Sequence, residues 1–384
     1  MSLSERIKKG HHIMRSVLLP PKPEDFFFLT FAITYRCNSK CTMCNIWRKY
    51  QEDPHKFSEE LSVQEISDIF GRSEILKKTR IFIIAGGEPF LKRDFNDIVL
   101  VFNELNPTAS IIIASNGQNS DLIGMKLRNI RQVLVERGNR ESVIGVGISL
   151  DGMEETHDRV RGVKGSFRRA LEAVDVIRNI EGMFAGLTFT FTPENYKEFY
   201  SVCDLAKKMK LGLTFQFAQT SGHYYDNSDI HFNWTKEQID EVRDILKRTR
   251  YFDIIRKGFF DYGISWAFKD RLLSYNRFFL EHVLAYQLHK ERHFNCYSGT
   301  HSCFLDPYGN VYPCISYEKD MGNIREQNFD DLWKSRRANE VREHISQRQC
   351  HCCSFCDIPN SLPRNLNVIT SNLKDILTPG RTAH

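Results

Sequence analysis

The sequence predicts an α/β protein in which parallel strands alternate with helices, as an open doubly wound sheet or a partial barrel. Between about residues 25 and 220, short apolar runs alternate with amphipathic stretches. Six runs have the length and composition of strands: FFFLTFAITY, TRIFIIAGG, SIIIASNG, VIGVGISLDG, FAGLTFTFT and LGLTFQFAQ. They are apolar almost throughout, as expected when both faces of a sheet are covered. Strands separated by helices of this length form parallel βαβ units.

The stretches between these strands have helical periodicity. The expected helices are 63–77, 95–105, 122–136, 167–179 and 195–210. In both arrangements, ligands bind where the carboxyl ends of the strands continue into loops. Motifs that directly follow a strand are therefore the candidates for a functional site.

The rest of the chain has a different character. The segment 221–295 is polar, helical and rich in aromatic residues, which predicts a helical insert. SCFLDPYGNVYPC predicts two short strands around a turn at Pro307–Gly309, and FDDLWKSRRANEVREHISQ predicts one helix before the cysteine-rich QCHCCSFCD. We expect five regions: an N-terminal extension (1–24), the core (25–220), the insert (221–295), a cysteine-rich domain (296–357) and a tail (358–384).

Composition and charge exclude several classes of protein. The chain has 41% hydrophobic and 26% charged residues and a net charge of only +5, so nothing in the charge indicates a nucleic-acid partner. The longest apolar run, 26–33, is too short to span a bilayer, and no signal peptide is recognisable, which predicts a cytoplasmic protein. Of the eleven cysteines, all but Cys203 lie in two groups, a distribution that favours metal binding over disulfides.

The first cysteine group, CNSKCTMC, follows the first predicted strand. Cys37, Cys41 and Cys44 can ligate three irons of a [4Fe–4S] cube and leave the fourth open for the amino and carboxylate groups of a small molecule. Zinc is disfavoured because it needs four ligands and the loop contains no histidine. Three core cysteines are also disfavoured, since polar residues lie between them.

This C-x₃-C-x₂-C motif resembles the radical S-adenosylmethionine (radical SAM) superfamily. The GGEP sequence after the second strand, SNG after the third and SLDG after the fourth resemble further motifs of the family. Met43 stands where the family has an aromatic or similarly bulky residue. The resemblance implies a partial (β/α)₆ TIM-like barrel. It also implies a cofactor site of Met43, Gly86, Gly87, Glu88, Pro89, Ser115, Asn116 and Ser149.

Two details of this resemblance are expectations for the structure to test. The glycines of GGEP are expected to let the backbone approach the ligand closely. The segment HDRVRG, with His157, Arg159 and Arg161, also recurs in the family, either as a charged structural turn or with a catalytic role.

The second cysteine group resembles the SPASM and Twitch extensions, which carry auxiliary [4Fe–4S] clusters. Because no cysteine follows Cys356, the pattern departs from the two-cluster form and favours one auxiliary cluster. A second cluster would need a ligand such as His351 or Asp357, and a zinc site is the remaining alternative. The resemblance implies a ligand set drawn from Cys296, Cys303, Cys314, Cys350, Cys353 and Cys356.

The resemblance implies an oxidoreductase or lyase that reductively cleaves S-adenosylmethionine to a 5′-deoxyadenosyl radical. An external reductant such as flavodoxin or ferredoxin would supply the electron. We expect a small-molecule substrate (carbohydrate, nucleotide sugar or lipid-linked) and net oxidation or rearrangement, because only 36 residues precede Cys37, too few for a leader-binding domain. The alternatives are a ribosomal peptide delivered by a separate protein, a methyltransferase mechanism and a non-enzymatic electron carrier.

Overall fold

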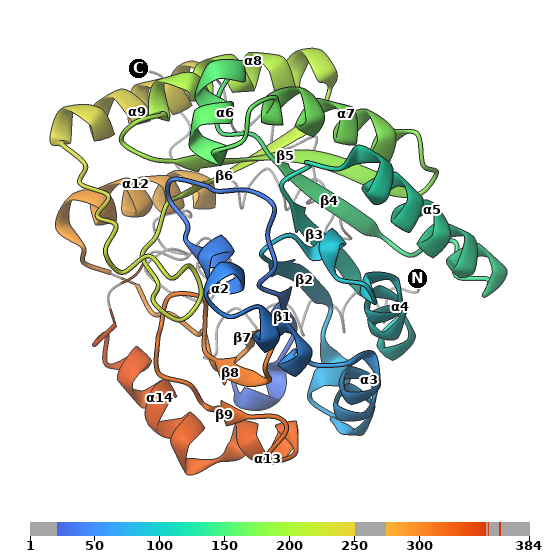
Figure 1. Cartoon of the computed structure of the whole chain (residues 1–384). Helices are drawn as coiled ribbons and strands as arrows, with labels where there is room; N and C mark the ends of the chain where they lie inside the picture. The colour runs from blue at the N-terminus through green and yellow to red at the C-terminus, as the bar shows by residue number, and fades with distance from the viewer. Residues whose placement is uncertain (1–20, 250–273, 293, 351, 353–360, 362–384) are drawn as a thin grey trace, which may run out of the picture.

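The computed structural model describes residues 21–249, 274–292, 294–350, 352 and 361 (Figure 1). The predicted ligands Cys353 and Cys356, the candidate ligands His351 and Asp357, and nearly all of the predicted tail lie outside the described residues. Within the described ranges, every helix is too short or too polar to cross a membrane.

Six parallel strands form the core and follow one another in chain order, β1 to β6. A doubly wound sheet would reverse its strand order, whereas a barrel keeps it, so this order identifies a partial barrel. The predicted strands are all confirmed: β1 (Phe28–Thr34), β2 (Ile81–Gly86), β3 (Ser110–Ser115), β4 (Ile144–Ser149), β5 (Met183–Phe191) and β6 (Gly212–Phe217).

Helices cover the outer face of this curved sheet (Figure 1). They are α3 (Val63–Arg72), α4 (Phe95–Leu105), α5 (Ser120–Glu136), α7 (Ser166–Arg178) and α8 (Phe199–Met209). The core between them and the sheet is aromatic: the buried rings of Phe82 on β2 and Phe102 on α4 stack with centroids 4.6 Å apart. Burial of this kind of face stabilises each βα unit more than helix propensity alone could.

Two elements near the strand ends were not predicted. A short helix, α2 (Ile46–Glu52), follows the cysteine loop, and α6 (Glu154–Arg161) contains most of HDRVRG. In the predicted insert, α9 (Lys236–Arg248) and α12 (Ser274–His289) are helical as expected.

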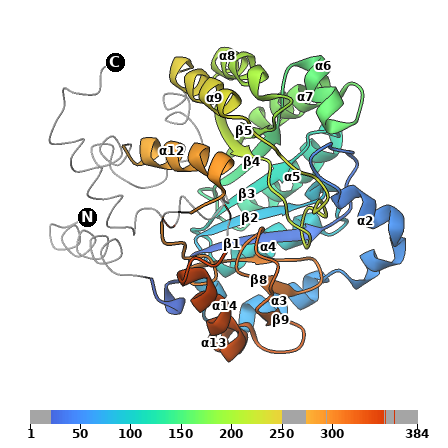
Figure 2. The same cartoon turned by 90° about the vertical axis from the view of Figure 1, so that its left-hand side faces the viewer.

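The C-terminal strands continue the barrel sheet. β7 (Ser302–Leu305) pairs in parallel with β1, and β8 (Asn310–Tyr312) and β9 (Gly322–Asn323) extend the sheet beyond it. The predicted hairpin of β7 and β8 is confirmed, with Gly309 at φ 91° in its turn. Figures 1 and 2 show β8 and β9 near two helices, α13 (Phe329–Lys334) and α14 (Arg336–Ser346). The cysteine-rich region is therefore joined to the core by backbone hydrogen bonds.

The prediction of one helix over 329–347 is wrong. The structure has two helices, α13 (Phe329–Lys334) and α14 (Arg336–Ser346), separated at Ser335. Ser335 is extended (φ −63°, ψ 160°), and its hydroxyl accepts a hydrogen bond from the amide of Ala338. Its side chain therefore caps a new helix, a competing conformation that serine favours.

Candidate active site at the strand ends

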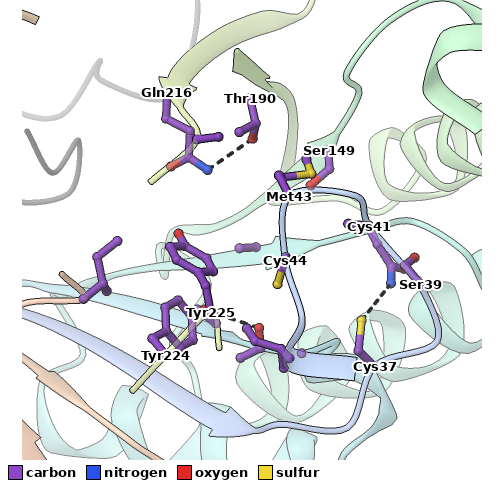
Figure 3. A pocket seen from close by; sticks show the side chains of 18 of the residues that line it. Cys37, Ser39, Cys41, Met43, Cys44, Ser149, Thr190, Gln216, Tyr224 and Tyr225 are labelled. Carbon is purple, nitrogen blue, oxygen red and sulfur yellow. Dashed lines mark hydrogen bonds between the residues drawn. The ribbon is translucent and has the colours of Figure 1, made fainter. Parts of the chain in front are cut away.

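A cavity of about 210 Å³ opens at the carboxyl ends of the barrel strands (Figure 3). Its wall combines the cysteine loop, the ends of β2 to β6 and the loop after β6. Most of the predicted cofactor and first-cluster residues line it: Cys37, Cys41, Met43, Cys44, Gly86, Gly87, Ser115, Asn116 and Ser149. Glu88 and Pro89 are buried behind this wall.

The cysteine loop is pinned to the end of α6. The amides of Lys40 and Thr42 donate to the carbonyls of Arg161 and Val160, each at 2.9 Å. Gly162 ends α6 with φ 63°, and a Cβ there would lie 2.3 Å from the carbonyl oxygen of Lys40. Only glycine allows this approach without displacing the loop. The HDRVRG segment therefore fixes the position of the cysteines.

The three half-buried cysteines share one environment. Burial raises the pKa of Cys37 to about 12, with a further contribution from Cys41, and burial also raises the pKa of Cys41. Burial and the neighbouring Cys41 likewise raise the pKa of Cys44. The main-chain amide of Ser39 donates to the sulfur of Cys37 (Figure 3). Bound iron would reverse these shifts, because a metal favours the thiolate.

The donor set fits an iron–sulfur cluster. In the described part of the chain, no three His, Cys, Asp or Glu side chains gather as a site for a single metal ion. A cube instead needs soft thiolates on separate irons beside an open space. Cys37, Cys41 and Cys44 around one cavity meet that requirement.

Glu88 links the ends of β2 and β3. Its buried carboxylate accepts hydrogen bonds from the Ser115 hydroxyl (3.0 Å) and the Asn116 amide (2.7 Å). The side chain of Asn116 in turn donates to Asn38 Oδ1 at 2.8 Å and lies 3.9 Å from Cys37 Sγ. Burial raises the pKa of Glu88 to about 7. This network orients the motif residues next to the cysteine loop.

Gly86 and Gly87 are needed because β2 ends against the chain that leaves β1. A Cβ at Gly86 would lie 2.1 Å from the carbonyl oxygen of Thr34, and one at Gly87 would lie 2.3 Å from that of Arg36. The Gly87 amide donates to the Thr34 carbonyl at 2.8 Å. We expected these glycines to admit a ligand. The structure shows that both glycines are required by the close approach of β2 to the chain that leaves β1.

Two residues of the HDRVRG segment have different roles: His157 is structural, and Arg161 faces the cavity. The ring of His157 is buried: Nδ1 accepts from the Asp151 amide and Nε2 donates to Ser166 Oγ, both at 3.0 Å. Burial lowers the pKa of His157 to about 3, so the ring is neutral and structural. Arg161 instead lines the cavity, where it pairs with Asp151 at 2.5 Å and donates to Cys41 Sγ at 3.6 Å.

Sequence reasoning missed the part of the cavity wall that β5, β6 and the loop after β6 contribute. This part contains Thr190, Gln216, Gln219, Tyr224 and Tyr225. The side-chain amide of Gln216 donates to Thr190 Oγ1 at 3.3 Å (Figure 3), and the Tyr224 hydroxyl donates to the Gly86 carbonyl at 3.3 Å. Their signal was present, since Thr190 and Gln216 lie near the ends of β5 and β6, where functional side chains of such barrels gather.

The described C-terminal cysteines are buried or half-buried. Burial raises the pKa of Cys350 to about 12, and the charges of Cys352 and Cys296 contribute, which places these thiols near one another. Arg292 donates to Cys350 Sγ at 3.5 Å. Cys303 lies on β7 within the main hydrophobic core.

Comparisons with known proteins agree with this geometry. Residues 31–206 match the family model described as radical SAM superfamily, and residues 296–357 match the SPASM model, described as an iron–sulfur cluster-binding domain. The chain is 24% identical to the AdoMet-dependent heme synthase of Methanosarcina barkeri (80% of this chain, 82% of that protein). It is 24% identical to the antilisterial bacteriocin subtilosin biosynthesis protein AlbA of Bacillus subtilis (91% and 71%). The solved structure of anSMEcpe with bound AdoMet has the same fold, with 16% identity, 91% and 95% coverage and a TM-score of 0.55.

Proposed function

Because this chain belongs to the radical SAM superfamily and carries a SPASM iron–sulfur domain, we propose that it modifies a peptide delivered by a separate protein. When bound, the [4Fe–4S] cluster and S-adenosylmethionine supply reductive sulfonium cleavage and hydrogen abstraction from a substrate carbon. The cysteine-rich C-terminal region suits a net oxidation, since an auxiliary cluster there would accept an electron from the substrate.

The residues of the cavity divide this work. Cys37, Cys41 and Cys44 would hold the cluster beside the cavity that they line, and three thiolates leave one iron of a cube without a protein ligand. Main-chain groups at Gly86 and Gly87 and the hydroxyl of Ser149 would hold S-adenosylmethionine. Glu88, Ser115 and Asn116 keep these strand ends in register, as their hydrogen bonds indicate. An external reductant such as flavodoxin or ferredoxin would supply the electron.

The observation that carries the peptide proposal is that the described residues lining the cavity include no unpaired charged side chain. Among the described residues that line the cavity, Arg161 is the only one with a permanent charge, and it is paired with Asp151, which offsets part of that charge. The part of the wall from β5, β6 and the loop after β6 offers amide and hydroxyl groups beside aromatic rings. A neutral peptide segment can satisfy such groups, because each of its amides both donates and accepts.

The relatives support the same proposal. AlbA is named for biosynthesis of a bacteriocin and matches over 91% of this chain. The expectation of a carbohydrate, nucleotide-sugar or lipid-linked substrate finds no such support, and the peptide alternative is favoured over it.

A tetrapyrrole is the second candidate substrate. The similarity to an AdoMet-dependent heme synthase over 80% of this chain favours it. Tetrapyrroles of this kind carry carboxylate side chains, which binding sites usually meet with arginine or lysine. The uncharged wall of this cavity fits them less well than it fits a peptide.

The test compares both substrate classes with one enzyme preparation. The anaerobically reconstituted chain is incubated with dithionite, S-adenosylmethionine and either peptides encoded beside its gene or iron coproporphyrin. We expect 5′-deoxyadenosine together with loss of hydrogen from a peptide, measured by mass spectrometry. Turnover with the tetrapyrrole but not with the peptides would overturn the proposal. S-adenosylhomocysteine as the cofactor product would overturn it as well.

The control is the variant with Cys37, Cys41 and Cys44 replaced by alanine. It should form no 5′-deoxyadenosine while it keeps iron in the C-terminal region. The wild type should hold about eight irons, and this variant about four. Retained cleavage of S-adenosylmethionine would show that another set of residues holds the cluster.

A further inference from the structure

Three contacts hold Arg161 against Cys41, a predicted cluster ligand. Its Nη1 donates to Cys41 Sγ at 3.6 Å, and its Nη2 pairs with Asp151 at 2.5 Å. Its carbonyl also receives the amide of Lys40 from the cysteine loop at 2.9 Å. One residue therefore both anchors the loop and presents a cation to its central thiol.

The partner of this cation is itself held rigidly. Asp151 is fully buried, and its Oδ1 accepts the amide of Thr190 on β5 at 2.7 Å. Its main-chain carbonyl accepts from Asn195 Nδ2 at 3.1 Å. The side chain of Arg161 is 9% exposed, so neither charge can leave the pair for solvent. A charge in such an environment acts strongly on its neighbours.

We infer that Arg161, held in place by Asp151, is a positioning residue that raises the reduction potential of the cluster bound at Cys41. Reduction adds a negative charge to the cluster, and a cation that donates to a ligating sulfur stabilises the reduced form. Asp151 opposes this effect because its carboxylate offsets part of the cation's charge. The inference rests on the proposed function, since it requires a cluster on Cys37, Cys41 and Cys44.

The opposite signs of the two charges separate this role from a purely structural one. Loss of the cation in Arg161→Gln should shift the potential to more negative values. Loss of the anion in Asp151→Asn, which keeps a carbonyl oxygen for hydrogen bonding, should shift it to more positive values. Arg161→Lys keeps the charge and should shift the potential less than Arg161→Gln. If the ion pair only stabilised α6, the two variants would not shift the reduction potential in opposite directions.

The matched control is Arg159→Gln. Arg159 lies on the same helix, α6, but is exposed, so this variant removes the same charge outside the buried site. Its potential should equal that of the wild type, because solvent screens an exposed charge.

The experiment is a redox titration of the anaerobically reconstituted full chain, followed by electron paramagnetic resonance without S-adenosylmethionine. Subtracting the signal of the Cys37/Cys41/Cys44→Ala variant isolates the cluster of interest. Equal potentials for Arg161→Gln and Arg159→Gln, or shifts of the same sign for Arg161→Gln and Asp151→Asn, would overturn the inference alone. A wild type with no signal beyond that of the triple variant would overturn the proposed function as well.

Discussion

At the scale of single residues, the motifs of this chain combine positions at the cavity with support for the fold. Glu88 belongs to the GGEP motif, yet it is buried behind the cavity and holds Ser115 and Asn116 in place. Gly86 and Gly87 line the cavity and also admit the neighbouring backbone of β1. A sequence motif therefore indicates where a cavity lies, whereas the role of each motif residue becomes visible only in the structure.

Glu88 makes the stability of the metal-free chain depend on pH. Burial raises its pKa from 4.5 to about 7, so in this interval the folded state binds a proton that the unfolded state has released. The free energy of unfolding contributed by Glu88 therefore falls as pH rises through this window, by up to about 3 kcal/mol. Glu88→Gln, which stays neutral, should lose this dependence.

Urea denaturation of the apo chain at about pH 5 and about pH 8 measures this difference. The matched control is Glu141→Gln, since Glu141 is exposed. An unchanged pH dependence in Glu88→Gln would show that another group is responsible.

At the scale of elements, the geometry of the cysteine loop depends on where α6 ends. Gly162 takes a left-handed conformation at the C-terminus of α6, in contact with Lys40. The next helix, α7, begins only four residues later, at Ser166. The sequence predicted the three cysteines but not α6, and α6 is the helix that positions their loop.

Gly162→Ala should displace the cysteine loop. The added Cβ meets the Lys40 carbonyl oxygen at 2.3 Å, and the left-handed backbone is itself strained for alanine. We expect a loss of at least about 2 kcal/mol in the free energy of unfolding and reduced iron incorporation at the first site. Urea denaturation of the apo chain and iron analysis after reconstitution measure the two effects.

Gly138→Ala provides the control for backbone strain. Gly138 has φ 75°, and nothing lies within 4 Å of the position of its Cβ. This variant should cost about 1 kcal/mol and keep full iron incorporation. Equal iron content in both variants would contradict the role given to the contact between Gly162 and Lys40.

At the scale of the whole molecule, one continuous sheet joins the barrel and the cysteine-rich region. β7 pairs with β1 over four residues, from Phe28↔Ser302 to Phe31↔Leu305. Phe304, which is fully buried, packs against Tyr224 of the cavity wall with ring centroids 4.8 Å apart. The site and the C-terminal region therefore share both a sheet and a core.

This continuity predicts cooperative unfolding. The amides of β1 and β7 should lose protection from hydrogen exchange at the same urea concentration, because each strand loses one of its two hydrogen-bonded neighbours when the other unfolds. Phe304→Ala should lower both midpoints together, with a loss of about 3–5 kcal/mol. Earlier loss of protection in β7 alone would show that the C-terminal region is an independent unit. Phe184→Ala is the control, since this ring is 50% exposed.

The sequence by itself determined the parallel α/β class and all six core strands, and it indicated that three cysteines gather with the motifs at the strand ends. These features depend on local periodicity and on motifs of adjacent residues, which a single chain displays directly. Only the tertiary structure decided that β7 extends the sheet at β1 and that Arg161 faces Cys41 while His157 is structural. It also decided that Gln216 and Tyr224 line the cavity. These features depend on contacts that form only in the folded chain, because the extension of the sheet and the burial of side chains are properties of the whole fold.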